Sequence, residues 1–157
     1  MVRLRHLLLV VLALLLTVSF GFAAGKGNFG AKLSGNEVVP TVTTPATGKA
    51  EFKLAKDGKD LTYKLTVTDI ENVTAAHIHL GKKGKNGGPL AGLFAGPKKD
   101  GKFTGVLAEG VITGKDLMGN LKGKPLAALV KLIKAGDTYV NVHTMGHPDG
   151  EIRGEIR

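Results

Sequence analysis

The segment Leu61-Thr62-Tyr63-Lys64-Leu65-Thr66-Val67-Thr68 decides the fold class, because its apolar residues occupy every second position. Such alternation buries one set of side chains and exposes the other, which is typical of a β-strand. The preceding segment Ala50-Glu51-Phe52-Lys53-Leu54 alternates in the same way, and the polar turn Asp57-Gly58-Lys59-Asp60 separates the two. We therefore predict an antiparallel hairpin over residues 50–68.

The rest of the chain shows the same pattern in shorter pieces, separated by breaks that are rich in its 23 glycines. Strands are predicted at residues 76–80, 103–107, 138–144 and 151–157. Residues 124–134 differ, because Leu126, Leu129, Val130 and Ile133 have the spacing of one helix face. Pro125 stands near the start of this segment and Gly136 beyond its end. The pattern predicts an all-β sandwich with one short helix, near residues 125–135, covering one end.

The N-terminus has the composition of an export signal. Two arginines precede the apolar run Leu7–Val18, and small residues follow at positions 21–25. This order predicts a secretory signal peptide cleaved after Ala23 or Ala24. The alternative is an uncleaved anchor, but about a dozen apolar residues are fewer than the roughly 20 that span a bilayer. We predict a signal peptide at 1–24, a flexible lead-in at 25–30 and one domain at 31–157, secreted or otherwise extracytoplasmic, with no membrane span after cleavage.

Composition excludes several kinds of chemistry. The chain has no cysteine, so thiol catalysis, thiolate metal sites and a lipoprotein anchor are excluded. Ser34 is the one serine of the predicted mature domain and lies in no nucleophile-elbow motif, so we predict no catalytic residue. The formal net charge of +9 falls to +7 without Arg3 and Arg5. Such an excess favours association with anionic surfaces.

Three of the lysines, Lys82, Lys83 and Lys85, lie in the glycine-rich stretch 81–89. We interpret this stretch as a mobile loop, with the lysines either contacting an anionic cell-surface polymer or protein partner, or simply solvated. No aromatic residues are interleaved to stack on bases, so nucleic-acid binding is not predicted.

All four histidines of the predicted mature domain lie in two short motifs. The first is Ala76-His77-Ile78-His79-Leu80-Gly81, and the second is Tyr139-Val140-Asn141-Val142-His143-Thr144-Met145-Gly146-His147-Pro148. Strand residues two apart share a face, so His77 and His79 point the same way, opposite to Ile78. If residues 145–149 form a hairpin loop, Val142 pairs with Ile152, Asn141 with Arg153 and Tyr139 with Glu155, and His143 falls opposite Glu151. This register separates apolar from polar side chains.

The two motifs offer ligands for a metal ion. Imidazoles from one strand face, joined by one from a neighbouring strand, suit copper or zinc. The predicted ligands are His77, His79 and His143, with His147 or Glu151 completing or orienting the site. The alternative is a structural network in which the histidines hydrogen-bond to Glu151, Asn141 and backbone groups. A shared metal site requires the imidazole nitrogens to converge within about 4 Å.

These motifs, together with Gly35-Asn36-Glu37-Val38-Val39-Pro40, Thr47-Gly48-Lys49-Ala50 and Pro148-Asp149-Gly150-Glu151-Ile152-Arg153-Gly154-Glu155-Ile156, resemble the CHRD domain, the module named after chordin. Glu155 stands where that family often has Gln. The resemblance implies an extracellular β-sandwich module. A weaker similarity, the hairpin followed by a His-x-His strand, is to the copper–zinc superoxide dismutase barrel. The resemblances imply an antiparallel Greek-key sandwich or barrel, immunoglobulin-like or superoxide-dismutase-like.

Three functions remain open from the sequence. The first is an exported, non-enzymatic binding or structural module of the CHRD family. The second is a copper- or zinc-binding protein that uses the two histidine motifs. The third is a superoxide-dismutase-like enzyme, which is disfavoured because the chain lacks that enzyme's bridging-imidazole ligand set and its disulfide.

Overall fold

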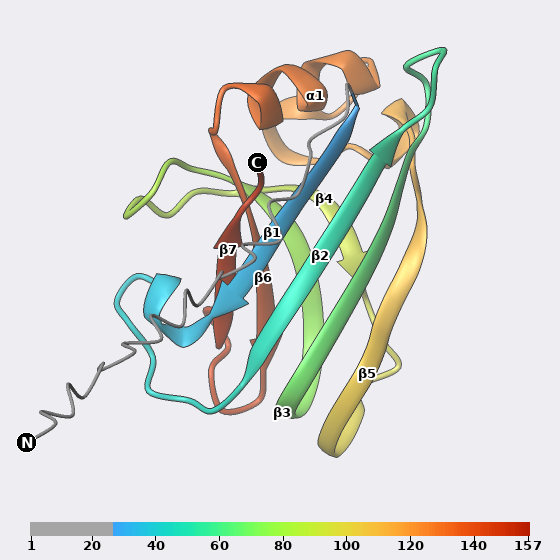
Figure 1. Ribbon diagram of the computed structural model, residues 1–157. Helices are drawn as coiled ribbons and strands as arrows, with labels where there is room; N and C mark the ends of the chain where they lie inside the picture. Colours follow the sequence, from blue (N-terminus) through green and yellow to red (C-terminus); the bar gives the residue numbers. More distant parts are fainter. Residues whose placement is uncertain (1–26) are drawn as a thin grey trace, which may run out of the picture.

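A computed structural model of the protein describes residues 27–157, so the predicted signal peptide lies outside the described residues. The strands are β1 (Asn28–Ser34), β2 (Thr47–Leu54), β3 (Leu61–Leu80), β4 (Pro89–Phe94), β5 (Lys99–Ile112), β6 (Thr138–Thr144) and β7 (Ile152–Glu155). The helix is α1 (Leu126–Lys134), and single 3-10 turns are η1 (Gly35–Glu37), η2 (Gly114–Asp116) and η3 (Gly119–Leu121). Figure 1 shows α1 across one end of the strands.

The sheet closes on itself. Neighbouring strands follow the order β2-β1-β7-β6-β3, and β2 also pairs with β3, which completes a ring. The strands β4 and β5 pair with β3 outside that ring, and the strand pairings are antiparallel. The structure therefore confirms the predicted all-β antiparallel fold, in the form of a closed barrel with added strands.

The long strand β3 organises the molecule. Its first half pairs with β2 and β5, and its second half pairs with β6 and β4. Between the halves, Asp69 (φ 51°) and Asn72 (φ 53°) have left-handed backbone conformations, which Asp and Asn tolerate better than most residues. The two strands predicted at 61–68 and 76–80 are thus one strand, and its second half carries His77 and His79 beside β6.

The core fills the barrel with side chains from the alternating positions. Leu61, Leu65 and Val67 are fully buried, as the period of two predicts. The four apolar residues of the predicted helix face, Leu126, Leu129, Val130 and Ile133, are buried in α1. Burial of each leucine or isoleucine contributes about 1.5–3 kcal/mol, so α1 is held at the barrel end chiefly by packing. The helix prediction is confirmed.

The structure differs from the sequence expectation at the start of the domain. Asn28–Gly30, assigned above to a flexible lead-in, belong to β1 and pair with Glu51–Lys53 of β2. Asn and Gly have low intrinsic strand preference, so the local sequence hides a strand that pairing with β2 stabilises. The last strand is also shorter than predicted, ending at Glu155 rather than residue 157.

Candidate metal site

Three histidines converge on one face of the β3–β6 pair. His77 and His79 come from β3, and His143 comes from β6, where it pairs with Ala75. Their ring centroids are 5.7 Å apart for His77 and His79, 5.3 Å for His77 and His143, and 5.6 Å for His79 and His143. One ring nitrogen from each lies within 4.8 Å of the other two. The two sequence motifs therefore meet in a nearly equilateral triangle of imidazoles.

Backbone carbonyls fix the tautomers of two of these rings. His79 Nδ1 is 2.8 Å from the Gly87 carbonyl oxygen, and His143 Nδ1 is 2.8 Å from that of Pro148. A carbonyl oxygen only accepts hydrogen bonds, so each Nδ1 carries the proton and donates. Each neutral ring then has an Nε2 that bears a lone pair.

Each of the three rings also has a buried nitrogen that makes no hydrogen bond within the described part of the chain. These atoms are His77 Nδ1, His79 Nε2 and His143 Nε2, and they have no hydrogen-bond partner among the described residues. A buried polar atom without a partner costs about 1–3 kcal/mol. Each ring of the cluster thus carries one such atom, and a cation held by all three rings would provide a partner of the kind that these nitrogens lack.

The surroundings keep the imidazoles of His77 and His79 uncharged. Burial, with a smaller contribution from His143 and His79, lowers the pKa of His77 from 6.5 to about 4. Burial also lowers the pKa of His79, against the opposing effect of its hydrogen bond to Gly87. Both rings are therefore neutral at physiological pH, which is the form that binds metal ions.

The ring nitrogens are bounded by a wider spacing than the ligand nitrogens of a metal-bound site have. Three nitrogens at 2.0–2.1 Å from a tetrahedral ion are about 3.4 Å apart, whereas the bound for this cluster is 4.8 Å. That bound exceeds the convergence of about 4 Å expected above. A contraction on the order of 1 Å by imidazole rotation closes the difference, because each ring swings about its Cα–Cβ and Cβ–Cγ bonds.

The other two predicted site residues lie elsewhere. His147 is in the β6–β7 turn, where its backbone N–H donates to Thr144 Oγ1, and it is not part of the converging group. Glu151 accepts from the hydroxyls of Thr44 (2.6 Å) and Thr144 (2.7 Å). Its carboxylate thus ties the segment before β2 to the β6–β7 hairpin, and it does not orient the imidazoles as predicted.

The predicted hairpin register is confirmed. Tyr139 pairs with Glu155, Asn141 with Arg153 and Val142 with Ile152. Asn141 Nδ2 donates to the Asp149 carbonyl oxygen. Neither Asn141 nor Glu151 therefore supplies the histidine hydrogen bonds of the structural-network alternative. The backbone carbonyls supply them.

The polar face of β6 is covered, which the sequence did not reveal. Tyr139 and Arg153 are each 2% exposed. The ring of Tyr139 stacks on His79, with centroids 5.2 Å apart and an interplanar angle of 18°. The Arg153 guanidinium lies 3.5 Å from the centre of the Tyr139 ring. The predicted register paired Arg153 with Asn141, on the same face as the histidines. A cation at that position was the one signal in the sequence that something polar covers this face.

The glycine-rich loop is anchored through its backbone. Its backbone carbonyls at Lys82 and Lys85 accept hydrogen bonds from Arg153. The lysine side chains themselves point outward. Lys82 lies 3.6 Å from Asp137, Lys83 lies 3.7 Å from Glu37, and these lysine side chains are 76% and 71% exposed. Such exposed ion pairs contribute little to stability, so the buried arginine holds the loop.

Comparison with known proteins agrees with the motifs. A family model described as the CHRD domain matches residues 29–156. The chain belongs to the CHRD family. The match spans the histidine motifs and nearly all of the described CHRD domain. No curated protein and no solved structure gives a significant match. In the described part of the chain, no helix has the length and apolar character needed to cross a membrane.

Proposed function

We propose that this CHRD domain is an exported, non-enzymatic binding module that holds a copper or zinc ion through His77, His79 and His143. The observation that carries the proposal is the convergence of three imidazoles, one ring nitrogen of each within 4.8 Å of the other two, together with a buried nitrogen on each ring that has no partner among the described residues. The predicted signal peptide supports a location outside the cytoplasm.

The ligand chemistry supports these two metals. Imidazole suits copper and zinc, whereas magnesium and calcium prefer oxygen ligands. The hydrogen bonds from His79 to Gly87 and from His143 to Pro148 are of the kind that orients ligating histidines in metal proteins. Two of the three rings have lowered pKa values, so proton competition for the ion is weak near neutral pH.

The test is calorimetric titration of the metal-free mature chain with Zn²⁺ and, separately, Cu²⁺ at neutral pH. We expect about one ion per chain for the wild type and loss of that binding in the His77→Ala/His79→Ala variant. The matched control is His147→Ala, which removes a histidine outside the cluster and should bind as the wild type does. Absence of stoichiometric binding, or equal binding by the double variant, overturns the proposal.

A second candidate function uses the lysine loop. The exposed side chains of Lys82 and Lys83, with Lys85 nearby in the same loop, support contact with an anionic cell-surface polymer. Binding to a soluble polyanion such as polyphosphate should then be salt-sensitive and should weaken when all three lysines are changed to Gln. Changing Lys115, Lys122 and Lys124, which are exposed outside this loop, removes the same number of charges and is the control. If both sets of substitutions weaken binding equally, the binding depends on net charge alone and not on this loop.

A further inference from the structure

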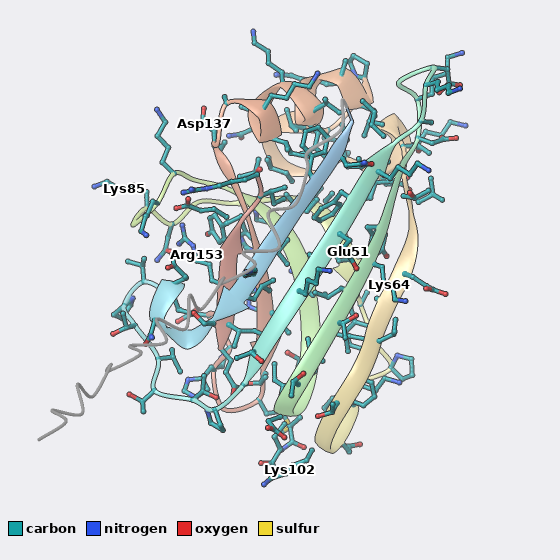
Figure 2. All side chains as sticks on the ribbon, in the orientation of Figure 1. Glu51, Lys64, Lys85, Lys102, Asp137 and Arg153 are labelled. Carbon is teal, nitrogen blue, oxygen red and sulfur yellow. The ribbon has the colours of Figure 1, made fainter. Side chains whose placement is uncertain are left out.

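Arg153 is a buried charge whose partners lie in the glycine-rich loop. Its Nη1 donates to Asn86 Oδ1 (2.9 Å), and its Nη2 donates to the carbonyl oxygens of Lys82 (3.1 Å) and Lys85 (2.9 Å). Figure 2 shows Arg153 next to the loop that carries Lys85. A buried guanidinium is stable only when it is paired and hydrogen-bonded, so the loop and Arg153 require each other. We call residues 81–88 the strap.

The strap contacts the histidine cluster through Gly87. The Gly87 carbonyl oxygen accepts from His79 Nδ1 (2.8 Å), and the Gly87 N–H donates to the Tyr139 hydroxyl (3.2 Å). The Tyr139 ring in turn contacts both the guanidinium of Arg153 and the imidazole of His79. These contacts link the buried Arg153 through Tyr139 to His79, a candidate metal ligand. Gly87 of the strap is hydrogen-bonded to both Tyr139 and His79.

Glycine is required where the strap lies closest to β3 and β6. A Cβ atom at Gly87 would collide with the Leu80 carbonyl oxygen. A Cβ atom at Gly81 would lie 2.5 Å from the Lys85 carbonyl oxygen and 2.9 Å from the Tyr139 ring. Gly88, by contrast, has open space around its Cβ position. Glycine is thus needed at Gly81 and Gly87, where the strap lies against β3 and β6, and not at Gly88.

We infer that the strap and the metal site are coupled: the closed strap orients His79 for binding, and a bound ion holds the strap closed. Arg153 is the positioning residue in this device. A ligating imidazole becomes a stronger N–H donor, so metal at His79 Nε2 strengthens the bond from Nδ1 to Gly87. Coupling is reciprocal in binding free energy. The inference rests on the proposed metal-binding function.

The coupling has an expected size. Loss of a group that orients a metal ligand typically weakens metal affinity by about 10–100-fold. By reciprocity, saturation with metal should reduce strap opening by the same factor. Lys82, Lys83 and Lys85 are trypsin sites within the strap, and cleavage of a transiently opened segment follows its open population when reclosing is fast.

The experiment is limited trypsin digestion of the mature chain in chelator and in saturating Zn²⁺, with the cut sites identified by mass spectrometry. We expect Zn²⁺ to slow cleavage after the strap lysines by about tenfold or more. Cleavage after Lys122, which is exposed outside the strap and is followed by Gly123, is the internal reference and should not change. A general effect of Zn²⁺ on trypsin would slow both sets equally.

Two variants test the role of Arg153. Arg153→Lys keeps the charge but loses the planar guanidinium, so zinc affinity should fall by about 10–100-fold and zinc protection of the strap should disappear. Asn86→Ala removes one acceptor at an exposed position and gives a milder test should Arg153→Lys fail to fold. Arg157→Lys, at an exposed arginine, is the control. A merely structural Arg153 would alter cleavage by the same factor with and without zinc.

The outcomes separate the two proposals. If the wild type binds neither zinc nor copper, the metal-binding function fails and the inference fails with it; if it binds copper alone, the same digestion with Cu²⁺ in place of Zn²⁺ tests the coupling. If the wild type binds zinc but strap cleavage does not change, only the coupling is overturned. The coupling is also overturned if folded Arg153→Lys, or Asn86→Ala in its place, retains wild-type zinc affinity and zinc protection.

Discussion

Acidifying the metal-free domain from about pH 7 to about pH 4 should destabilise it through His77. The pKa of this side chain is about 4 in the folded protein, against 6.5 as the ordinary value. Between these two values the unfolded chain binds a proton that the folded chain does not, so the free energy of unfolding falls as the pH falls. The contribution is constant above 6.5 and is fully lost below about 4. His79 acts in the same direction, because burial lowers its pKa too.

The magnitude follows from the two pKa values. Each pKa unit corresponds to about 1.4 kcal/mol, so complete conversion gives roughly 3 kcal/mol. His77 is only half-buried, and solvent screening reduces that figure. We therefore expect about 1–2 kcal/mol from His77, which is a substantial part of the roughly 5–15 kcal/mol that stabilises a typical domain.

The assay is urea unfolding in chelator at several pH values between about 7 and 4, for the wild type and for His77→Gln. The wild type should lose about 1–2 kcal/mol more than the variant over this range. His147→Gln, which removes a histidine outside the cluster, should retain the wild-type pH dependence. The reasoning is refuted if wild type and His77→Gln show the same pH slope, or if the His77 ring titrates near pH 6.5 by NMR.

Three further predictions concern the parts that position the site. Glu151→Ala leaves two threonine hydroxyls without their carboxylate, and should lower the free energy of unfolding by about 2–3 kcal/mol in urea titrations. Gly87→Ala should cost about 2 kcal/mol or more and weaken zinc binding in calorimetry, whereas Gly88→Ala should stay within about 0.5 kcal/mol; equal effects would contradict the packing. Ile78→Val, on the core face of β3, should cost about 1 kcal/mol without changing zinc affinity, and a changed affinity would show that the two faces are not independent.

Local sequence determined much of the fold. Alternation at 61–68, the helix spacing at 126–133 and the hairpin register of β6 with β7 were all readable, since each depends on neighbours or on a short turn. The same local rule placed His77 and His79 on one face. The strand at Asn28–Gly30 was not readable, because it forms by pairing with β2 and has a weak local preference.

The candidate metal site depends on tertiary contacts as well as on local sequence. The sequence by itself determined which histidines face together and, through its motifs, the CHRD family. The sequence also predicted His143 as the third member of the cluster, and the pairing of β6 with β3 brings it there. The tertiary structure alone decided that Glu151 bonds to threonines. It alone also decided that the strap covers the polar face over a buried Arg153. The physical reason is range: periodicity reports which side a residue faces, but what covers that side depends on contacts between segments far apart in the chain, such as Arg153 with Lys82.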